Sequence, residues 1–103
     1  MPERAYPGRG LHGRVIRELG LRIVGGALPP GSSLPNEDEL GAELGVSRTV
    51  VREAVKVLLA KGLVEVRPRT GTRVRPRRSW HLLDPDVVAW QFQSIEGHRT
   101  GPP

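Results

Sequence analysis

The chain of 103 residues is long enough for one small domain, and its 16 lysines and arginines outnumber its 11 aspartates and glutamates to give a net charge of +5. This basic balance favours a polyanionic partner, most often nucleic acid, while the absence of cysteine excludes disulfides, thiol nucleophiles and thiolate metal sites. The sequence also lacks an apolar run long enough to span a bilayer and the apolar core of a signal peptide, so we expect a cytoplasmic protein with no membrane partner.

The first predicted element is an amphipathic helix over residues 11–25. Its apolar side chains recur at four-residue steps, while arginine and glutamate occupy the opposite face. Gly25-Gly26 ends the helix, and the proline-rich turn that follows leaves only residues 32–34 for a short extended piece. The apolar face consists of Leu11, Val15, Ile16, Leu19 and Ile23.

A second, short helix is predicted to begin after Asn36. Asn36 is a favourable N-cap, and Glu39 stands where a capping box requires it. Two further acids fill the first turn, where negative charge stabilises the positive end of the helix dipole. Leu40 and Leu44 form the apolar stripe, and Gly45 ends the helix because it adopts the left-handed conformation readily.

A third helix is predicted over residues 48–61, directly after the N-cap Ser47. Only Val46 separates this cap from Gly45, so the turn between the two helices is very tight. Helices that cross through such a turn need a small residue at their contact, and Gly41 supplies it. The buried face of the third helix is predicted to contain Val51, Ala54, Val55 and Leu58.

A β-hairpin is predicted next, because residues 63–67 alternate as a strand and residues 72–75 return after a turn that contains proline and glycine. Six arginines and no acid occur from Arg67 to Arg78, so the tip of the hairpin is expected to be basic. The predicted fold is therefore mainly α with a small β-hairpin. It is a winged helix-turn-helix, with three helices plus a wing and a short C-terminal linker helix.

The start of the third helix is the first candidate contact site. In a helix-turn-helix, the first turn of the second helix reaches base edges in the major groove. Arginine can bond bidentately to guanine, and serine or threonine can reach phosphates or bases. An ordinary helical hairpin that binds nothing is the alternative interpretation. The outward residues of this turn are Ser47, Arg48, Thr49 and Arg52.

The basic hairpin is the second candidate contact site. Beside a recognition helix, an arginine-lined hairpin is placed to enter the minor groove or to grip phosphates. The alternative is a solvated basic turn without a role. We predict that the wing, residues 67–74, contacts DNA through Arg69, Thr70 and Gly71.

The sequence gives no support for catalysis or for a metal site. His12, His81 and His98 are scattered, without partners at metal-ligand spacing. The acids form no catalytic pair, Ser47 has no base nearby in the sequence, and no phosphate-binding glycine loop is present. We therefore expect no enzymatic activity, no metal and no cofactor.

Two motifs resemble the N-terminal domain of GntR-type transcription regulators. Residues 30–40, PGSSLPNEDEL, are similar to the family pattern P-G-x-x-L-P-x-E-x-x-L, and residues 45–54, GVSRTVVREA, are similar to its G-V-S-R-x-x-V-R-E-A core. The resemblance covers residues 11–75 and includes the family's GLV strand and its wing, here Gly71-Thr72-Arg73-Val74.

Residues 80–90 resemble the linker of the fatty-acid-regulator (FadR) branch of this family, which opens the first helix of an all-helical effector domain. In this chain Asp84 is a suitable N-cap and Pro85 a suitable first helical residue. Val88 and Phe92 are expected to form the apolar side of this linker helix.

The family resemblance implies the DNA-binding domain of a bacterial transcription regulator, usually a repressor, that binds a palindromic operator as a homodimer. It implies that Arg48 and Arg52 read bases in the major groove, and that Ser47 and Thr49 contact phosphates. It also implies that the wing tip near Gly71 enters the minor groove.

Two residues depart from the family pattern. Asp38 stands where an arginine that touches DNA is common, and an acid there repels phosphate. Arg69 stands in the wing where glycine is usual. The operator preference of other members therefore does not transfer to this chain.

We predict four segments along the chain. They are a flexible N-terminal arm over residues 1–10, the DNA-binding domain over residues 11–75, a linker over residues 76–93 that starts a missing effector domain, and a disordered tail over residues 94–103. Without the effector domain, we expect no response to a small-molecule effector. No large apolar surface is evident outside the core, so we expect a monomer or weak dimer in solution that pairs on DNA.

Two other interpretations remain open. A winged helix can serve as a protein-interaction module, although such a surface is expected to present apolar or aromatic side chains rather than Arg48 and Arg52. The basic stretch from Arg67 to Arg78 could instead bind RNA, but few aromatic residues are present to stack on bases.

Overall fold

In the computed structural model, which describes residues 10–100 and the side chains of residues 10–95, the helix-turn-helix and its hairpin form as predicted. The described part of the chain is mainly helical, with one two-stranded antiparallel sheet. A fourth helix follows the hairpin, so the predicted fold class is confirmed. The elements in chain order are α1 (Gly10–Val24), α2 (Glu37–Leu44), α3 (Arg48–Ala60), β1 (Val64–Arg67), β2 (Gly71–Val74), the 3₁₀ turn η1 (Arg77–Ser79) and α4 (Pro85–Thr100).

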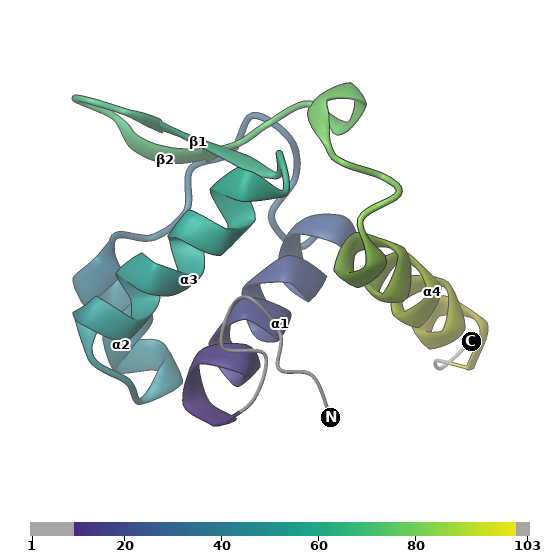
Figure 1. The fold of residues 1–103 in the computed structure, drawn as a ribbon, viewed down its shortest axis with the longest axis horizontal. Helices are drawn as coiled ribbons and strands as arrows, with labels where there is room; N and C mark the ends of the chain where they lie inside the picture. Colours follow the sequence, from purple (N-terminus) through teal and green to yellow (C-terminus); the bar gives the residue numbers. More distant parts are fainter. Residues whose placement is uncertain (1–9, 101–103) are drawn as a thin grey trace.

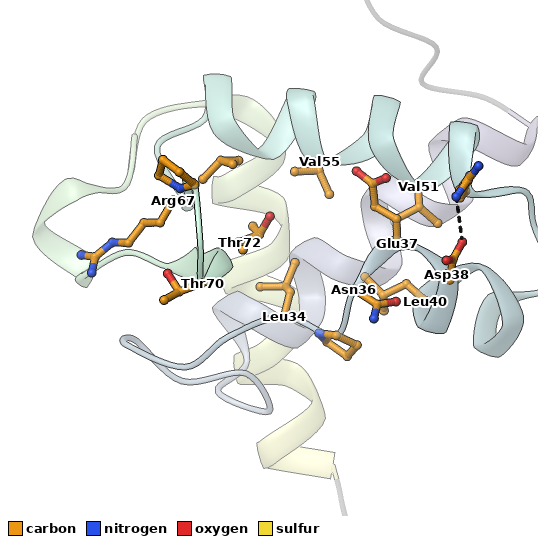
Figure 2. A pocket seen from close by; sticks show the side chains of 15 residues that line it. Leu34, Asn36, Glu37, Asp38, Leu40, Val51, Val55, Arg67, Thr70 and Thr72 are labelled. Carbon is orange, nitrogen blue, oxygen red and sulfur yellow. Dashed lines mark ion pairs between the residues drawn. The ribbon is translucent and has the colours of Figure 1, made fainter.

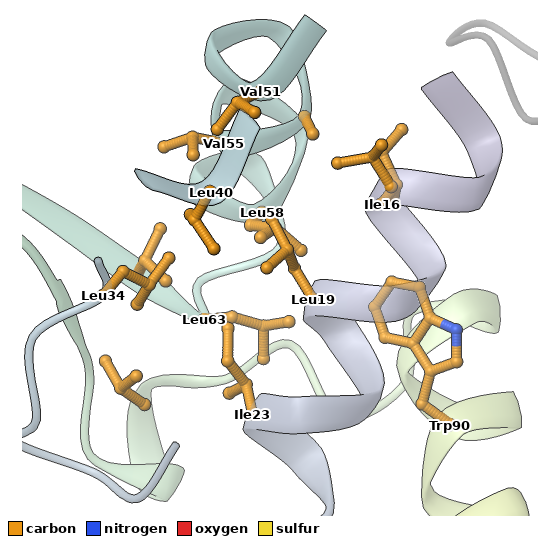
Figure 3. Packing of buried hydrophobic residues seen from close by; sticks show 14 of the residues in the cluster. Ile16, Leu19, Ile23, Leu34, Leu40, Val51, Val55, Leu58, Leu63 and Trp90 are labelled. Atoms are coloured by element: carbon orange, nitrogen blue, oxygen red, sulfur yellow. The ribbon is translucent and has the colours of Figure 1, made fainter. Parts of the chain in front are cut away.

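Helix α1 lies in the middle of the molecule, with the pair α2 and α3 on one side and α4 on the other (Figure 1). Its apolar face meets α3 and the residue just before β1, where Leu19 and Ile23 lie near Leu58 and Leu63 (Figure 3). Leu11 departs from the predicted buried row, because it lies in the first turn of α1 and is 46% exposed. The core therefore begins one turn later than the sequence repeat does.

The hairpin rests on the core through its base. Val64 pairs with Val74 in the antiparallel register, and both are buried. The predicted extended piece adds to the free edge of this sheet, because Leu34 donates its N–H to the carbonyl of Thr72 at 2.9 Å and Ser33 bridges to Arg73. The base of the wing is thus fixed, while its tip extends away from the core (Figure 1).

Helix α4 packs on α1 through Trp90, a contact that the sequence analysis missed. The Trp90 ring is buried, and it lies so close to Gly20 that a Cβ atom there would be 2.6 Å from Cε3 of the ring. Figure 3 shows the ring beside the backbone of α1. Glycine at position 20 therefore provides the space in which α4 docks.

The predicted apolar side of the linker helix is wrong. Val87 and Trp90 are buried, whereas Phe92 is 64% exposed and Val88 only half-buried. Two contacts set this rotation of α4, namely Trp90 over α1 and the carboxylates of its first turn on Lys61. Sequence periodicity cannot detect either contact, because both partners lie in other helices.

The C-terminal boundary also differs from the prediction. Helix α4 continues to Thr100, so residues 94–100 are helical rather than part of a disordered tail. Residues 1–9 of the predicted arm and residues 101–103 lie outside the described part of the chain. No helix in the described part is long and apolar enough to cross a membrane.

A buried lysine joins the end of α3 to the start of α4. Lys61 is 5% exposed, and its Nζ lies 3.0 Å from Oδ1 of Asp84 and 2.9 Å from Oδ2 of Asp86. It also lies 5.9 Å from the centre of the Trp90 ring, within cation–π range. Because a buried charge needs partners, this cluster fixes where the fourth helix begins.

Asp84 caps α4 as predicted, since its Oδ1 accepts the backbone N–H groups of Asp86 at 2.9 Å and Val87 at 3.2 Å. Partial burial by itself would raise the pKa of Asp84. The hydrogen bond from Lys61 and the two backbone N–H groups outweigh burial, so the pKa is held below its ordinary value. The ionised carboxylate is therefore part of the folded structure.

Replacing Gly20 by alanine should destabilise the fold, although alanine is the better helix former. The added methyl group must displace the Trp90 ring, and such overpacking costs about 1–3 kcal/mol. Thermal unfolding followed by circular dichroism measures the effect. The smaller ring in a Gly20→Ala, Trp90→Phe double variant should recover part of the loss. A Gly20→Ala variant as stable as the wild type would contradict this packing.

Acid should weaken the fold through Asp84. Because its pKa is lowered in the folded state, its contribution is complete above about pH 4, the ordinary value for aspartate, and is lost as the pH falls through the folded-state pKa. Asp84→Asn should lower the free energy of unfolding at pH 7 by about 1–2 kcal/mol. It should also flatten the decline of that free energy below about pH 4. Urea unfolding at several pH values measures both, with the surface change Glu53→Gln as control.

Candidate nucleic-acid interface

The crossing of α2 and α3 positions the candidate interface. Gly45 ends α2 in the left-handed conformation with φ 72° and ψ 35°, as predicted. Its N–H and that of Val46 both reach the carbonyl oxygen of Gly41. A Cβ atom at Gly41 would lie 2.7 Å from the carbonyl oxygen of Val46, so only glycine fits where the helices touch. The prediction that Gly41 is the small residue at the crossing is confirmed.

The two helix starts are capped as the sequence predicted. Asn36 accepts the N–H of Glu39 at 2.8 Å, and the Glu39 carboxylate accepts the N–H of Asn36 at 2.9 Å, which completes a capping box. Ser47 accepts the N–H of Val50 at 3.2 Å and caps α3. These caps fix where each helix begins, and thereby which side chains its first turn presents.

The four residues predicted for the recognition helix lie at its exposed start. Ser47, Arg48, Thr49 and Arg52 are all exposed, while the opposite side of α3 faces the core. The structure therefore brings these four together on one surface. The buried residues of α3 are Val50, Val51, Ala54, Val55 and Leu58.

Both arginines of this surface have acidic neighbours, which the sequence analysis missed. Nη1 of Arg48 lies 3.6 Å from Oδ1 of Asp38, and Arg52 donates to Oε1 of Glu37 from Nε at 3.3 Å and Nη2 at 3.2 Å. These pairs lie on the surface rather than inside the fold, since both arginines and Asp38 are exposed and Glu37 is only half-buried. The hydrogen bond to Glu37 raises the pKa of Arg52, so its charge is permanent.

A signal for these ion pairs was present in the sequence. Glu37 and Asp38 occupy the first turn of α2, where the helix dipole already gives acids a role. Their second role follows only from the crossing of the helices, which lays the first turn of α2 beside the start of α3. The acidic residue Glu53 of α3 pairs instead with Lys56 at 3.2 Å, on the same helix.

A groove of about 550 Å³ separates the start of α3 from the wing (Figure 2). Arg48 lies at one side of the groove, and Thr70 and Gly71 of the wing lie at the other. Arg69 is exposed at the tip of the hairpin. The groove thus brings together one predicted residue of α3 and two of the wing, whereas the other predicted residues, Ser47, Thr49, Arg52 and Arg69, do not line it.

The arginines between residues 67 and 78 do not form one basic patch. Arg67 pairs with Glu65 at 2.6 Å, and Arg73 donates to the carbonyl of Gly31 at 3.2 Å. Arg77 stacks over the Trp80 ring at 5.5 Å and donates to Gln91 of α4 at 3.1 Å. Several of these arginines therefore support the fold as well as adding charge.

The histidines do not gather into a site in the described part of the chain. His12 is half-buried in α1 and His81 is exposed before α4, while His98 lies where side chains are not described. No group of three or more histidine, aspartate or glutamate side chains among the described residues is arranged to hold a metal ion.

Comparisons with known proteins agree on the type of domain. The model of the family described as bacterial regulatory proteins, gntR family, matches residues 11–74. An uncharacterized HTH-type transcriptional regulator, YieP of Escherichia coli, is 55% identical over 84% of this chain and 37% of its own length. The galactonate operon transcriptional repressor of the same organism is 42% identical over 79% of this chain and 35% of its own length.

One solved structure similar to this chain is a complex with an operator. The DNA-binding domain of AraR in complex with operator ORR3 is 30% identical, with a TM-score of 0.61 over 72% of this chain and 89% of that domain. This chain spans just over a third of the length of the two E. coli regulators, and the matched part is the one that holds the α2–α3 crossing and the wing.

Replacing Gly41 by alanine should loosen the helix-turn-helix. The new methyl group would meet a backbone oxygen at 2.7 Å, and backbone yields less easily than a side chain. We expect a loss of about 1–3 kcal/mol in the free energy of unfolding, measured by urea denaturation. Ala42→Ser, at the exposed next position of α2, is the control and should change it by less than about 0.5 kcal/mol. Equal stability of both variants would show that the crossing tolerates a side chain.

Proposed function

The chain belongs to the gntR family of bacterial regulatory proteins, and from this premise we propose that it binds double-stranded DNA sequence-specifically, as the DNA-binding domain of a transcription regulator. Helix α3 lies in the major groove and the wing at the minor groove. One observation carries the proposal, namely that the capped, exposed start of α3 and the wing tip border the same groove. The solved relative that shares this fold is a complex with operator DNA.

The start of α3 supplies the contacts that read sequence. Arg48 and Arg52 present guanidinium groups that can donate two parallel hydrogen bonds to the O6 and N7 atoms of guanine. Ser47 and Thr49 flank Arg48 at the helix start, where hydroxyl groups and the positive end of the helix dipole both favour phosphate. The first turn of α3 therefore combines base reading with placement on the backbone.

The wing supplies the second contact. Arg69 and Thr70 are exposed at its tip, and Gly71 lets the chain turn with a φ of 80° where backbone can approach DNA closely. A phosphate strand that passes from the major to the minor groove would cross the groove between Arg48 and the wing tip. The minor groove, with its negative potential, attracts an inserted arginine.

The regulator as a whole is a repressor that binds a palindromic operator as a homodimer in the cytoplasm, and this chain by itself is a monomer or weak dimer in solution that pairs on DNA. Repression is the activity named for the galactonate operon relative. We assign DNA binding to residues 11–75 and a linker to residues 76–93. We also assign the chain to the fatty-acid-regulator (FadR) branch of the family, because its linker resembles that of this branch. In sedimentation, the fraction of dimer should therefore rise with protein concentration. The operator should lower the protein concentration at which the dimer forms.

A protein-interaction module is the second candidate. Three apolar side chains, Leu83, Phe92 and Ile95, are exposed on α4 and the turn before it, and they are where a protein partner could make contact. These residues lie outside the surface formed by α3 and the wing, so a protein contact at α4 would leave DNA binding intact. If Arg48→Ala and Arg52→Ala leave retention on DNA unchanged while abolishing the capture of a protein partner, this candidate replaces DNA binding.

Selection of binding sites from a random duplex pool is the direct test. We expect the chain to enrich one short motif, with binding that weakens steeply as salt rises because phosphate contacts release counterions. Single-stranded RNA of the same length should not compete. Failure to enrich any motif would overturn the proposed function.

Arg48→Ala should then cost about 1–3 kcal/mol on the selected site, because a bidentate base contact is lost. On random DNA the cost should be much smaller. Fluorescence anisotropy on both duplexes measures the difference. Arg17→Ala is the control, because Arg17 lies on α1 and donates to Gln93 of α4, away from the proposed interface. Equal losses on both duplexes would remove base reading by Arg48.

A further inference from the structure

Asp38 places a carboxylate on the surface that we assign to DNA. Its Oδ1 lies 3.6 Å from Nη1 of Arg48, and the two side chains are 75% and 65% exposed (dashed line in Figure 2). Neither side chain belongs to the core that holds α2 against α3. The pair is therefore free to act at the surface.

Stability does not account for this acid. Glu37 and Glu39 already place negative charge in the first turn of α2, and Glu39 completes the capping box. A surface ion pair as exposed as that of Asp38 and Arg48 contributes little to folding. An acid at this position also repels phosphate, so it works against general affinity for DNA. Any contribution of Asp38 to binding must therefore lie in the choice between DNA sequences.

We propose that Asp38 is a specificity-determining positioning residue, which acts through Arg48. This inference rests on the proposed function. A guanidinium group has five N–H donors, and guanine takes two of them. A carboxylate that engages one edge of Arg48 leaves enough donors for a base and restrains the direction in which they point. Arg48 then discriminates between bases instead of following the nearest phosphate.

The charge of the pair leads to the same conclusion. Asp38 offsets the charge of Arg48, so the pair gives little attraction to random DNA. Glu37 restrains Arg52 more closely, because one of its oxygens accepts two hydrogen bonds from that guanidinium group, whereas Asp38 and Arg48 form an ion pair at 3.6 Å. Glu37 is less exposed than Asp38, so Asp38 is the cleaner residue to change. The first turn of α2 thus holds both arginines of the recognition helix.

The test compares Asp38→Asn with a matched control. Asparagine keeps the size of the side chain but removes its charge. Glu43→Gln makes the same change on the same helix, where Glu43 pairs with Arg22 of α1 at 2.6 Å rather than with α3. Thermal melting first shows that each variant is as stable as the wild type. Asp38→Ser then repeats the binding measurement with a second uncharged side chain.

Binding is measured to the motif selected by the wild type and to random duplex over a salt series. Asp38→Asn should bind random DNA several-fold more tightly, and its slope of log affinity against log salt should steepen by about 1, as for one added phosphate contact. Its preference for the motif should fall about tenfold, at the bases that Arg48 reads. Glu43→Gln should match the wild type.

A double variant separates positioning from direct reading. In an Arg48→Ala background, Asp38→Asn should cause no further loss of base preference. Two outcomes would overturn the inference, provided that the wild type selects a motif. One is an unchanged preference for the motif after Asp38→Asn alone, and the other is that Asp38→Asn causes the same loss of preference in the Arg48→Ala background as it does alone. A wild type that selects no motif would instead overturn the proposed function itself.

Discussion

The close approach of α2 and α3 at Gly41 is the constraint on which the rest of the structure depends. A methyl group at this position would press on the carbonyl oxygen of Val46. Because the helices touch there, the turn closes within three residues, with Gly45 in the left-handed conformation. The same approach lays the first turn of α2 beside the start of α3. The position of Arg48 and Arg52 next to acids is therefore a consequence of one backbone contact.

Helix α3 is fixed at both ends by different physical means. At its start, Ser47 caps the backbone and α2 crosses closely, so the orientation depends on packing and hydrogen bonds. At its end, the buried Lys61 is held by Asp84 and Asp86 of the next helix, so the orientation depends on charge. Trp90 adds a cation–π contact to this lysine while its ring packs over α1. Helix α4 is thereby joined to the end of the recognition helix through a few charged groups.

Sequence reasoning succeeded where the cause is local. The caps at Asn36 and Ser47 and the stop at Gly45 were predictable, because each depends on neighbours within four residues. It failed at α4, where Phe92 was expected inside and is exposed, since the rotation of that helix is set by Gly20 and Lys61. The candidate site residues were found from spacing, but their acidic partners depend on how two helices cross.

The distribution of charge also depends on how the helices cross, so the net charge of +5 does not by itself show where positive charge lies on the surface. Around α3 the arginines are paired with acids, and in the wing Arg67 is paired with Glu65. The excess of positive charge is therefore not concentrated where bases would be read. Under the proposed function, long-range attraction to DNA must arise from positive charge elsewhere, including the exposed Arg69 and Arg78. Attraction and reading then fall to different parts of the domain, and paired arginines suit reading because their acidic neighbours offset the charge that would draw them to any phosphate.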